Sequence, residues 1–200
     1  MSALSELNEQ IITCTRCSLH AGRTRAVPGE GPENPQILFI GEAPGFHEDR
    51  SGRPFVGASG QFLEQMLEGI GLKRTDVFIA NVIKCRPPGN REPQPAEIET
   101  CKPYLDRQIE LLKPKVVITL GRFSMARYFP GAKVSDIHGQ PRKIGNVLYI
   151  PMFHPAAALH QPGLRRTVEE DMAKIPALLA QFDQVKETPP SQDVEQLSLF

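Results

Sequence analysis

The chain has 200 residues, with 23 lysines and arginines against 23 aspartates and glutamates, so its formal net charge is zero. This length suits one domain of ordinary size with its own hydrophobic core. No stretch approaches the roughly 18 apolar residues of a membrane-spanning helix, and the first residues lack the features of a signal peptide, so we expect a cytoplasmic protein and no membrane partner.

Apolar runs predict four buried strands, at residues 36–41, 77–83, 115–121 and 147–152. Stretches with helical spacing of apolar residues separate them, and the last helix is expected at about 166–182. Strands that are apolar on both faces and alternate with helices are typical of a parallel sheet covered on two sides. The predicted fold is therefore α/β, a single three-layer domain with a central, mainly parallel four-stranded sheet flanked by helices.

Small and polar residues follow these strands. Residues 41–45 (G-E-A-P-G) come directly after the first strand, Asn81 lies within the second, Gly121 closes the third, and His154 follows the fourth. Because ligands of parallel sheets gather at the carboxyl ends of the strands, we expect one site at this edge. Taken singly, the glycines could only shape a turn, and Asn81 could bond to backbone across the sheet.

The chain contains four cysteines, two in a C-T-R-C motif at Cys14 and Cys17 and two 16 positions apart at Cys85 and Cys101. In a reducing compartment such cysteines are more often metal ligands or redox groups than disulfides. Thiolates select zinc or an iron–sulfur cluster, and the spacing does not choose between them. A Pro-rich loop between the second pair favours a cluster, and unpaired thiols are the alternative.

The motifs G-E-A-P-G-x3-D-x2-G-x-P-F-V-G, N-V-I-K-C-R-P-P-G-N-R-x-P and H-P-A-A, combined with these cysteines, resemble the family 4 uracil-DNA glycosylases. This is the iron–sulfur branch of the uracil-DNA glycosylase superfamily, and the resemblance covers approximately residues 8–180. It implies a monofunctional uracil-DNA glycosylase that flips uracil out of DNA and hydrolyses the N-glycosidic bond. An abasic site would remain for base excision repair.

The resemblance also assigns ligands and contacts. It implies a structural [4Fe–4S] cluster held by Cys14, Cys17, Cys85 and Cys101. It places the uracil-binding residues at Gly41, Glu42, Ala43, Phe55, Asn81 and His154.

The chemistry explains these residue types. A flipped base needs an aromatic face, which Phe55 would supply, and a hydrogen-bonding edge, which the Asn81 amide would read at O4 and N3–H. His154, near O2, would donate to the negative charge that develops on the departing uracil.

Water activation is where this sequence departs from the best-known branch of the superfamily. That branch has an aspartate in the first motif, where this chain has Ala43. The candidate catalytic carboxylates are Glu42 and Glu48, which join His154 as the expected catalytic residues. We expect Glu48 to orient the water and Glu42 to orient the pocket.

Basic residues near these motifs predict DNA contacts at Lys84, Arg86 and Arg91. After the catalytic histidine, Leu164 is the candidate wedge that fills the gap left by a flipped base, flanked by Arg165 and Arg166. The last two arginines could also be a solvated helix start.

Residues 183–200 carry four acidic residues and one lysine, which leaves the domain at 1–182 with a net charge of +3. This polar tail is predicted to be flexible. Its end resembles the short peptide by which bacterial DNA polymerases and repair proteins dock on the replication sliding clamp. We expect clamp binding through the residues Gln196, Leu197, Leu199 and Phe200. The alternative is a tail end that folds back on the domain.

Two other classes of function stay open. A non-catalytic, metal-containing nucleic-acid-binding module would bind DNA, but it leaves Phe55, Asn81 and His154 without a role. A relative that binds uracil-DNA covalently would carry a basic insertion with a histidine near the first motif; no insertion is present, although His47 is. The expected partner is uracil-containing DNA, and the expected state is a monomer.

Overall fold

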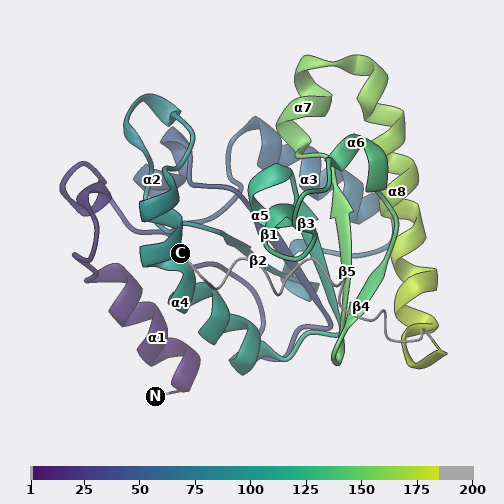
Figure 1. The fold of residues 1–200 in the computed structure, drawn as a ribbon, viewed down its shortest axis with the longest axis horizontal. Helices are drawn as coiled ribbons and strands as arrows, with labels where there is room; N and C mark the ends of the chain where they lie inside the picture. The colour runs from purple at the N-terminus through teal and green to yellow at the C-terminus, as the bar shows by residue number, and fades with distance from the viewer. Residues whose placement is uncertain (1, 185–200) are drawn as a thin grey trace.

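The computed structural model describes residues 2–184 and places a five-stranded sheet between two layers of helices (Figure 1). The strand order is β2-β1-β3-β5-β4. The strands are β1 (Ile37–Gly41), β2 (Phe78–Asn81), β3 (Val116–Leu120), β4 (Arg142–Ile144) and β5 (Val147–Met152). The three-layer α/β fold expected from the sequence is thereby confirmed.

The helices connect these strands and cover both faces of the sheet. No helix within residues 2–184 is long and apolar enough to cross a membrane. The α-helices are α1 (Ala3–Ile12), α2 (Phe46–Ser51), α3 (Ala58–Gly69), α4 (Pro95–Leu112), α5 (Arg122–Ala126), α6 (Val134–Ile137), α7 (Pro155–His160) and α8 (Pro162–Ala180). Short 3-10 helices are η1 (Ser18–Ala21), η2 (Arg74–Asp76), η3 (Pro88–Asn90) and η4 (Phe182–Gln184).

The two faces of the sheet bury separate hydrophobic clusters. In β1, Leu38 and Ile40 belong to the cluster under α1 and α4, while Ile37 and Phe39 belong to the cluster under α3 and α8. In Figure 1, α1 and α4 lie on the left of the sheet and α8 on the right. Because alternate residues of a strand point to opposite faces, a strand covered on both sides must be apolar throughout, as β1 is.

The sheet differs from the sequence prediction in one strand. β2, β1, β3 and β5 are parallel, as expected, and β4 pairs antiparallel with β5 at the edge. β4 contains Arg142 and Lys143 and is only partly buried, so it lacks the apolar run by which the other strands were identified. The prediction of four strands was therefore one short.

Two predicted boundaries also shift. The second strand ends at Asn81 rather than at residue 83, although the amides of Val82 and Ile83 still donate to Gly41 O and Glu42 O. The last helix begins at Pro162, earlier than the expected 166, with the proline in the first turn. Proline is well suited there because its missing N–H would have no partner in a helix.

α3 lies so close to the loop before it that only glycine fits at position 60. A Cβ there would overlap the carbonyl carbon and oxygen of Phe55. Gly69, at the other end of α3, has open space where its Cβ would be. Replacing glycine with alanine at each of the two positions therefore distinguishes the effect of close packing on stability from the effect of helix propensity.

We predict that Gly60→Ala lowers the free energy of unfolding by about 1–3 kcal/mol, the usual cost of overpacking. Gly69→Ala should leave it unchanged or raise it by up to about 1 kcal/mol, because alanine favours helix over glycine. Denaturant unfolding of both variants measures these changes. Equal stability of Gly60→Ala and the unaltered protein would contradict the close approach of α3 to Phe55.

Candidate active site

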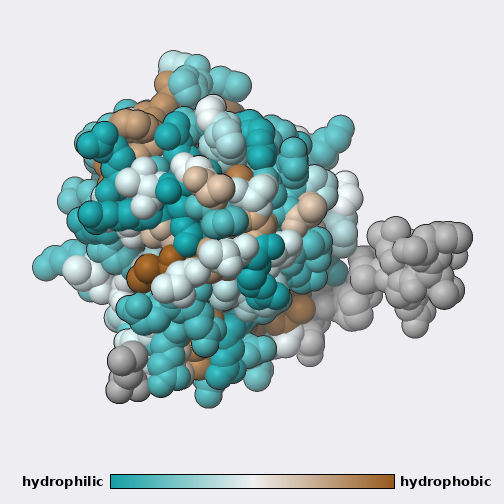
Figure 2. Space-filling model, turned by 90° about the vertical axis from the view of Figure 1, so that its left-hand side faces the viewer, coloured by the Kyte–Doolittle hydropathy of each residue, from teal (hydrophilic) through white to brown (hydrophobic). Residues whose placement is uncertain are grey.

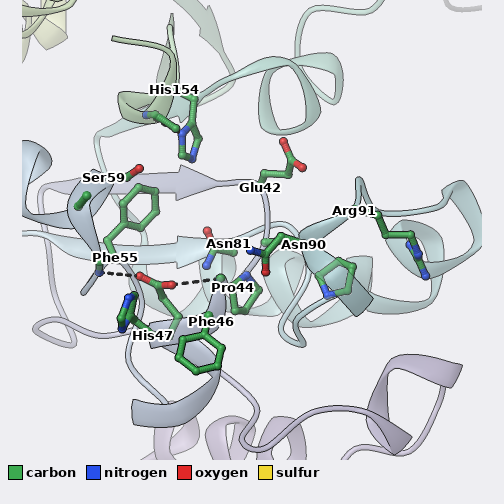
Figure 3. Close-up of a pocket in the computed structure, with 17 residues that line it drawn as sticks. Glu42, Pro44, Phe46, His47, Phe55, Ser59, Asn81, Asn90, Arg91 and His154 are labelled. Atoms are coloured by element: carbon green, nitrogen blue, oxygen red, sulfur yellow. Dashed lines mark hydrogen bonds between the residues drawn. The ribbon is translucent and has the colours of Figure 1, made fainter. Parts of the chain in front are cut away.

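A cavity of about 620 Å³ lies at the carboxyl ends of the strands (Figure 3). It is lined by side chains from the end of β1, the end of β2, the loop before α3 and the start of α7. The structure thus brings together residues far apart in the sequence, among them Glu42, Ala43, Glu48, Phe55, Asn81 and His154.

Gly41 makes room for two of these side chains. β1 and β2 are in register so that Gly41 lies beside Asn81. A Cβ at position 41 would overlap the Asn81 amide oxygen and lie 2.6 Å from two ring carbons of Phe55. Gly41 does not line the cavity itself; its contribution is to let the amide and the ring approach each other.

Asn81 presents an unused hydrogen-bond acceptor. The residue is 2% exposed, and its Oδ1 is buried with no hydrogen-bond partner within residues 2–184. A buried polar atom without a partner costs about 1–3 kcal/mol. A ligand with an N–H group at this point of the cavity would remove that cost.

His154 is held as a neutral donor. Its Nδ1 accepts a hydrogen bond from the amide of Ala156 at 3.1 Å, which leaves the proton of the neutral ring on Nε2. Burial lowers the pKa of His154 to about 4, although the nearby charge of Glu48 acts in the opposite direction. The ring stacks against Phe55 with centroids 5.6 Å apart and points into the cavity in Figure 3.

Phe55 has an unusual backbone conformation, with a positive φ of 51°. Its carbonyl oxygen accepts a hydrogen bond from Arg74 Nη1 at 2.9 Å. On the other side, Glu48 Oε1 accepts from the amides of Val56 and Gly57 at 2.8 and 2.9 Å. These bonds fix the loop on both sides of the aromatic ring.

The two candidate catalytic carboxylates differ in their surroundings. Both Glu48 oxygens accept backbone hydrogen bonds, since Oε2 also receives the amide of Gly45 at 3.1 Å (dashed lines in Figure 3). The Glu42 carboxylate has no hydrogen-bond partner within residues 2–184. Burial raises the pKa of Glu42, the charge of Glu92 raises it further, and Arg122 opposes both effects.

The structure contradicts the predicted DNA contact of Lys84. The side chain is 1% exposed, and its Nζ donates to Asn81 O at 2.9 Å and to Gln108 Oε1 at 2.6 Å. Its ammonium group therefore supports the end of β2 from inside the protein. No local pattern marks this burial, because a lysine between an apolar run and an arginine-containing loop equally fits the surface.

The other predicted DNA-contacting cations lie at least partly on the surface. Arg91 lines the cavity and forms a two-pronged ion pair with Glu97, at 2.6 and 2.9 Å. Arg165 and Arg166 are exposed, and each pairs with the glutamate four residues further along α8. Arg86 is partly exposed and has no carboxylate partner among the described residues.

The predicted wedge is less accessible than a neighbouring leucine. Leu164 is partly buried and packs against the core under α8. Leu159, in α7, is 44% exposed. α7 (Pro155–His160) is capped by His154 and ends at the turn into α8. Leu159 is therefore the more exposed apolar side chain of the two.

Several cavity residues were not assigned to the site from the sequence. Phe46, His47, Ser59 and Asn90 line it. They lie in loops or at helix starts, where no periodicity marks which side chains point inward. Asn90 does belong to the quoted motif N-V-I-K-C-R-P-P-G-N-R-x-P.

The four cysteines line one small pocket between α1, the loop after β2 and α4. Cys85 and Cys101 are buried, while Cys14 and Cys17 are partly exposed. No three cysteine, histidine or acidic side chains in residues 2–184 lie close enough together to hold a single metal ion. The four thiols are therefore gathered around a common space.

Comparisons with known proteins identify the family of the chain. The family model of the uracil DNA glycosylase superfamily matches residues 28–180. The chain is 47% identical to the type-4 uracil-DNA glycosylase of Sulfurisphaera tokodaii over 185 residues, which covers 88% of this chain and 84% of the relative. For the proteins of the same name from Archaeoglobus fulgidus and Saccharolobus solfataricus, the identities are 44% and 43%, covering 88% and 90% of this chain and 92% and 88% of the relatives.

The matched segments span the cavity, the sheet and most of the helices, and the family model alone covers more than half of the chain. The chain therefore belongs to the uracil-DNA glycosylase superfamily, within its type-4 branch.

Proposed function

We propose that the protein is a monofunctional uracil-DNA glycosylase, which hydrolyses the N-glycosidic bond of a flipped-out deoxyuridine and leaves an abasic site. The observation that carries this proposal is the unpaired Asn81 acceptor in a cavity that also contains Phe55 and His154. The type-4 relatives bear the name of this activity. Since DNA is the substrate, the cytoplasm and its nucleoid are the proposed place of action.

The cavity suits uracil better than cytosine. Uracil N3–H can donate to Asn81 Oδ1, and uracil O4 can accept from the amide NH₂ of the same residue. Cytosine has an unprotonated N3 and an amino group at these positions. Its N3 acceptor would face the acceptor Asn81 Oδ1, and its amino donor would face the donor NH₂ of Asn81. The Phe55 ring supplies the flat apolar face against which an extruded base can stack.

Bond breaking leaves an electron pair on uracil N1 and positive charge on the sugar. The Nε2–H of neutral His154 can donate to uracil O2, where the negative charge of the leaving group accumulates. A water molecule then attacks the anomeric carbon and loses a proton to a carboxylate, and the uracil anion takes up a proton from solvent. No electron transfer is involved.

Glu42 is the better candidate for accepting the proton of that water, although the sequence alone favoured Glu48. Glu48 already accepts three backbone hydrogen bonds that hold the Phe55 loop. Glu42 lines the same cavity with a free carboxylate, and its raised pKa makes it a stronger base than an exposed glutamate. We therefore assign a positioning role to Glu48 and the basic role to Glu42.

The DNA backbone would contact the cations on the cavity side of the protein, with Arg86, Arg91, Arg165 and Arg166 as the candidates. Leu159 replaces Leu164 as the proposed side chain that fills the gap left by the flipped base, because it is the more exposed of the two.

The four cysteines fit a [4Fe–4S] cluster. Each thiolate of such a cluster binds a different iron, so the sulfurs surround a larger space than a single zinc ion would need. Four thiols that line one pocket are consistent with this requirement. When bound, the cluster would supply a structural link between the N-terminal segment, the loop after β2 and α4.

The predicted clamp-binding residues Gln196, Leu197, Leu199 and Phe200 lie outside the described residues, and clamp binding stays a prediction. The monomeric state is likewise a prediction from the sequence.

We predict that Asn81→Ala and His154→Ala each lower the rate of uracil release at least about a hundredfold, the scale for loss of a hydrogen bond made to the transition state. The assay uses an oligonucleotide with one uracil and alkaline cleavage of the abasic product. His160→Ala is the control, because His160 is exposed and does not line the cavity. An intact strand with the unaltered protein would reject the proposal, and a protein–DNA adduct that survives denaturation would favour the covalent alternative.

The pH profile tests the assignment of Glu42. As pH falls, kcat should decrease when Glu42 takes up a proton, at a pKa above the ordinary glutamate value of 4.5. Neutral His154 should persist to about pH 4, so its protonation should add a second decrease only there. Glu42→Gln should lower kcat and remove the first decrease. An unchanged acidic limb in Glu42→Gln would show that another group activates the water.

We predict that Cys17→Ser lowers the iron content and the visible iron–sulfur absorption of the purified protein, and also its thermal stability. Thr100→Ser is the control, since Thr100 lines the same pocket without offering a thiolate. Stoichiometric zinc in place of iron in the unaltered protein would contradict the cluster assignment.

A further inference from the structure

Phe46 is an exposed aromatic side chain at the edge of the candidate active site. Within residues 2–184 the large exposed hydrophobic residues are Ile12, Phe46, Ile144 and Leu159, and of these only Phe46 lines the cavity. It is 47% exposed at the start of α2. Figure 3 shows its ring at the cavity edge below Pro44. The surrounding face, which carries α1 and α2, is mostly hydrophilic, with only small apolar patches (Figure 2).

Two arginines lie over this ring. The guanidinium carbon of Arg86 is 5.2 Å from the ring centroid and that of Arg50 is 5.6 Å from it. Arg86 is oriented by a hydrogen bond from its Nε to Asn90 Oδ1 at 2.7 Å, and Asn90 also lines the cavity. Arg86 is thus connected to the pocket through the loop that follows β2, while Arg50 and Phe46 both belong to α2.

The charges of these arginines are not compensated. Neither Arg50 nor Arg86 has an ion pair with a carboxylate in the described part of the chain, whereas Arg91, Arg165 and Arg166 each have one. An exposed cation–π contact contributes only about 0.5–1 kcal/mol, and two guanidinium groups over one ring repel each other. An anion between or beside them would relieve this repulsion.

We infer that Phe46 stacks against an unpaired nucleobase next to the flipped uridine, while Arg50 and Arg86 bind the phosphates on either side of that base. This inference rests on the proposed glycosylase function. Every base has a flat π face, so such stacking tolerates any neighbouring sequence. In a duplex the neighbouring base is paired and stacked, whereas in a single strand it is free to move. Phe46 therefore favours uracil in single-stranded DNA.

The test compares Phe46→Ala and Phe46→Trp on single-stranded and duplex substrates with one uracil. Phe46→Ala should lower kcat/KM on the single strand about 5- to 150-fold, the range for loss of one base–aromatic stack. Activity on the duplex should change less than about threefold, and Phe46→Trp should retain single-strand activity. Ile144→Ala is the control, because Ile144 is also an exposed hydrophobic residue but lies in β4, at the amino-terminal end of β5 and away from the cavity.

A second readout does not depend on catalysis. A single strand with a non-hydrolysable uridine analogue next to 2-aminopurine should lose fluorescence on binding the unaltered protein and Phe46→Trp, but not Phe46→Ala. Arg50→Gln and Arg86→Gln should each reduce the slope of log affinity against log salt by about 0.7, the value for one phosphate contact on a single strand.

The outcomes separate this inference from the function on which it rests. Uracil release by the unaltered protein with equal single-strand activity in Phe46→Ala, or with unchanged salt slopes in both arginine variants, would overturn the inference and leave the glycosylase function intact. If the unaltered protein releases no uracil, the proposed function fails and the inference fails with it.

Discussion

The backbone of Phe55, held in a left-handed conformation, is the constraint on which the site depends. A bulky residue with positive φ costs of the order of 1–3 kcal/mol and persists only where its surroundings enforce it. Here Arg74 binds the Phe55 carbonyl and Glu48 binds the two amides that follow. Gly60 allows α3 to close against the same carbonyl. The charged side chains of Arg74 and Glu48 thus hold the strained loop in place and fix the position of the aromatic ring.

The parallel sheet supplies the other side of the cavity. β1 lies between β2 and β3, and β5 follows β3, so the ends of β1, β2 and β5 face the same edge. Register places Asn81 directly beside Gly41, and the missing side chain of Gly41 lets the amide and the Phe55 ring meet above β1. His154 arrives from β5, across β3, and stacks on that ring. Sheet register and one strained loop together determine the arrangement.

Much of this could be predicted from the sequence, because it follows from local pattern. Runs that are apolar on both faces identified the four parallel strands, and strand ends located the cavity. β4 was not predicted from the sequence because its arginine and lysine interrupt any apolar run. The burial of Lys84 depends on Gln108, 24 residues away, and the exposure of Leu159 rather than Leu164 depends on where α7 meets α8. These properties are set by tertiary packing, which no local pattern records.

Burial shifts the pKa values of His154 and Glu42 toward each other. In water a glutamate loses its proton well before a histidine does. In this cavity burial lowers the pKa of His154 to about 4, while burial and the charge of Glu92 raise that of Glu42 above 4.5. Burial thus favours the uncharged form of each group, and His154 stays neutral at any pH well above 4. Above both pKa values, His154 is a neutral donor and Glu42 is a free carboxylate. His154 can then donate a hydrogen bond to the negatively charged departing uracil, and Glu42 can accept a proton from the attacking water.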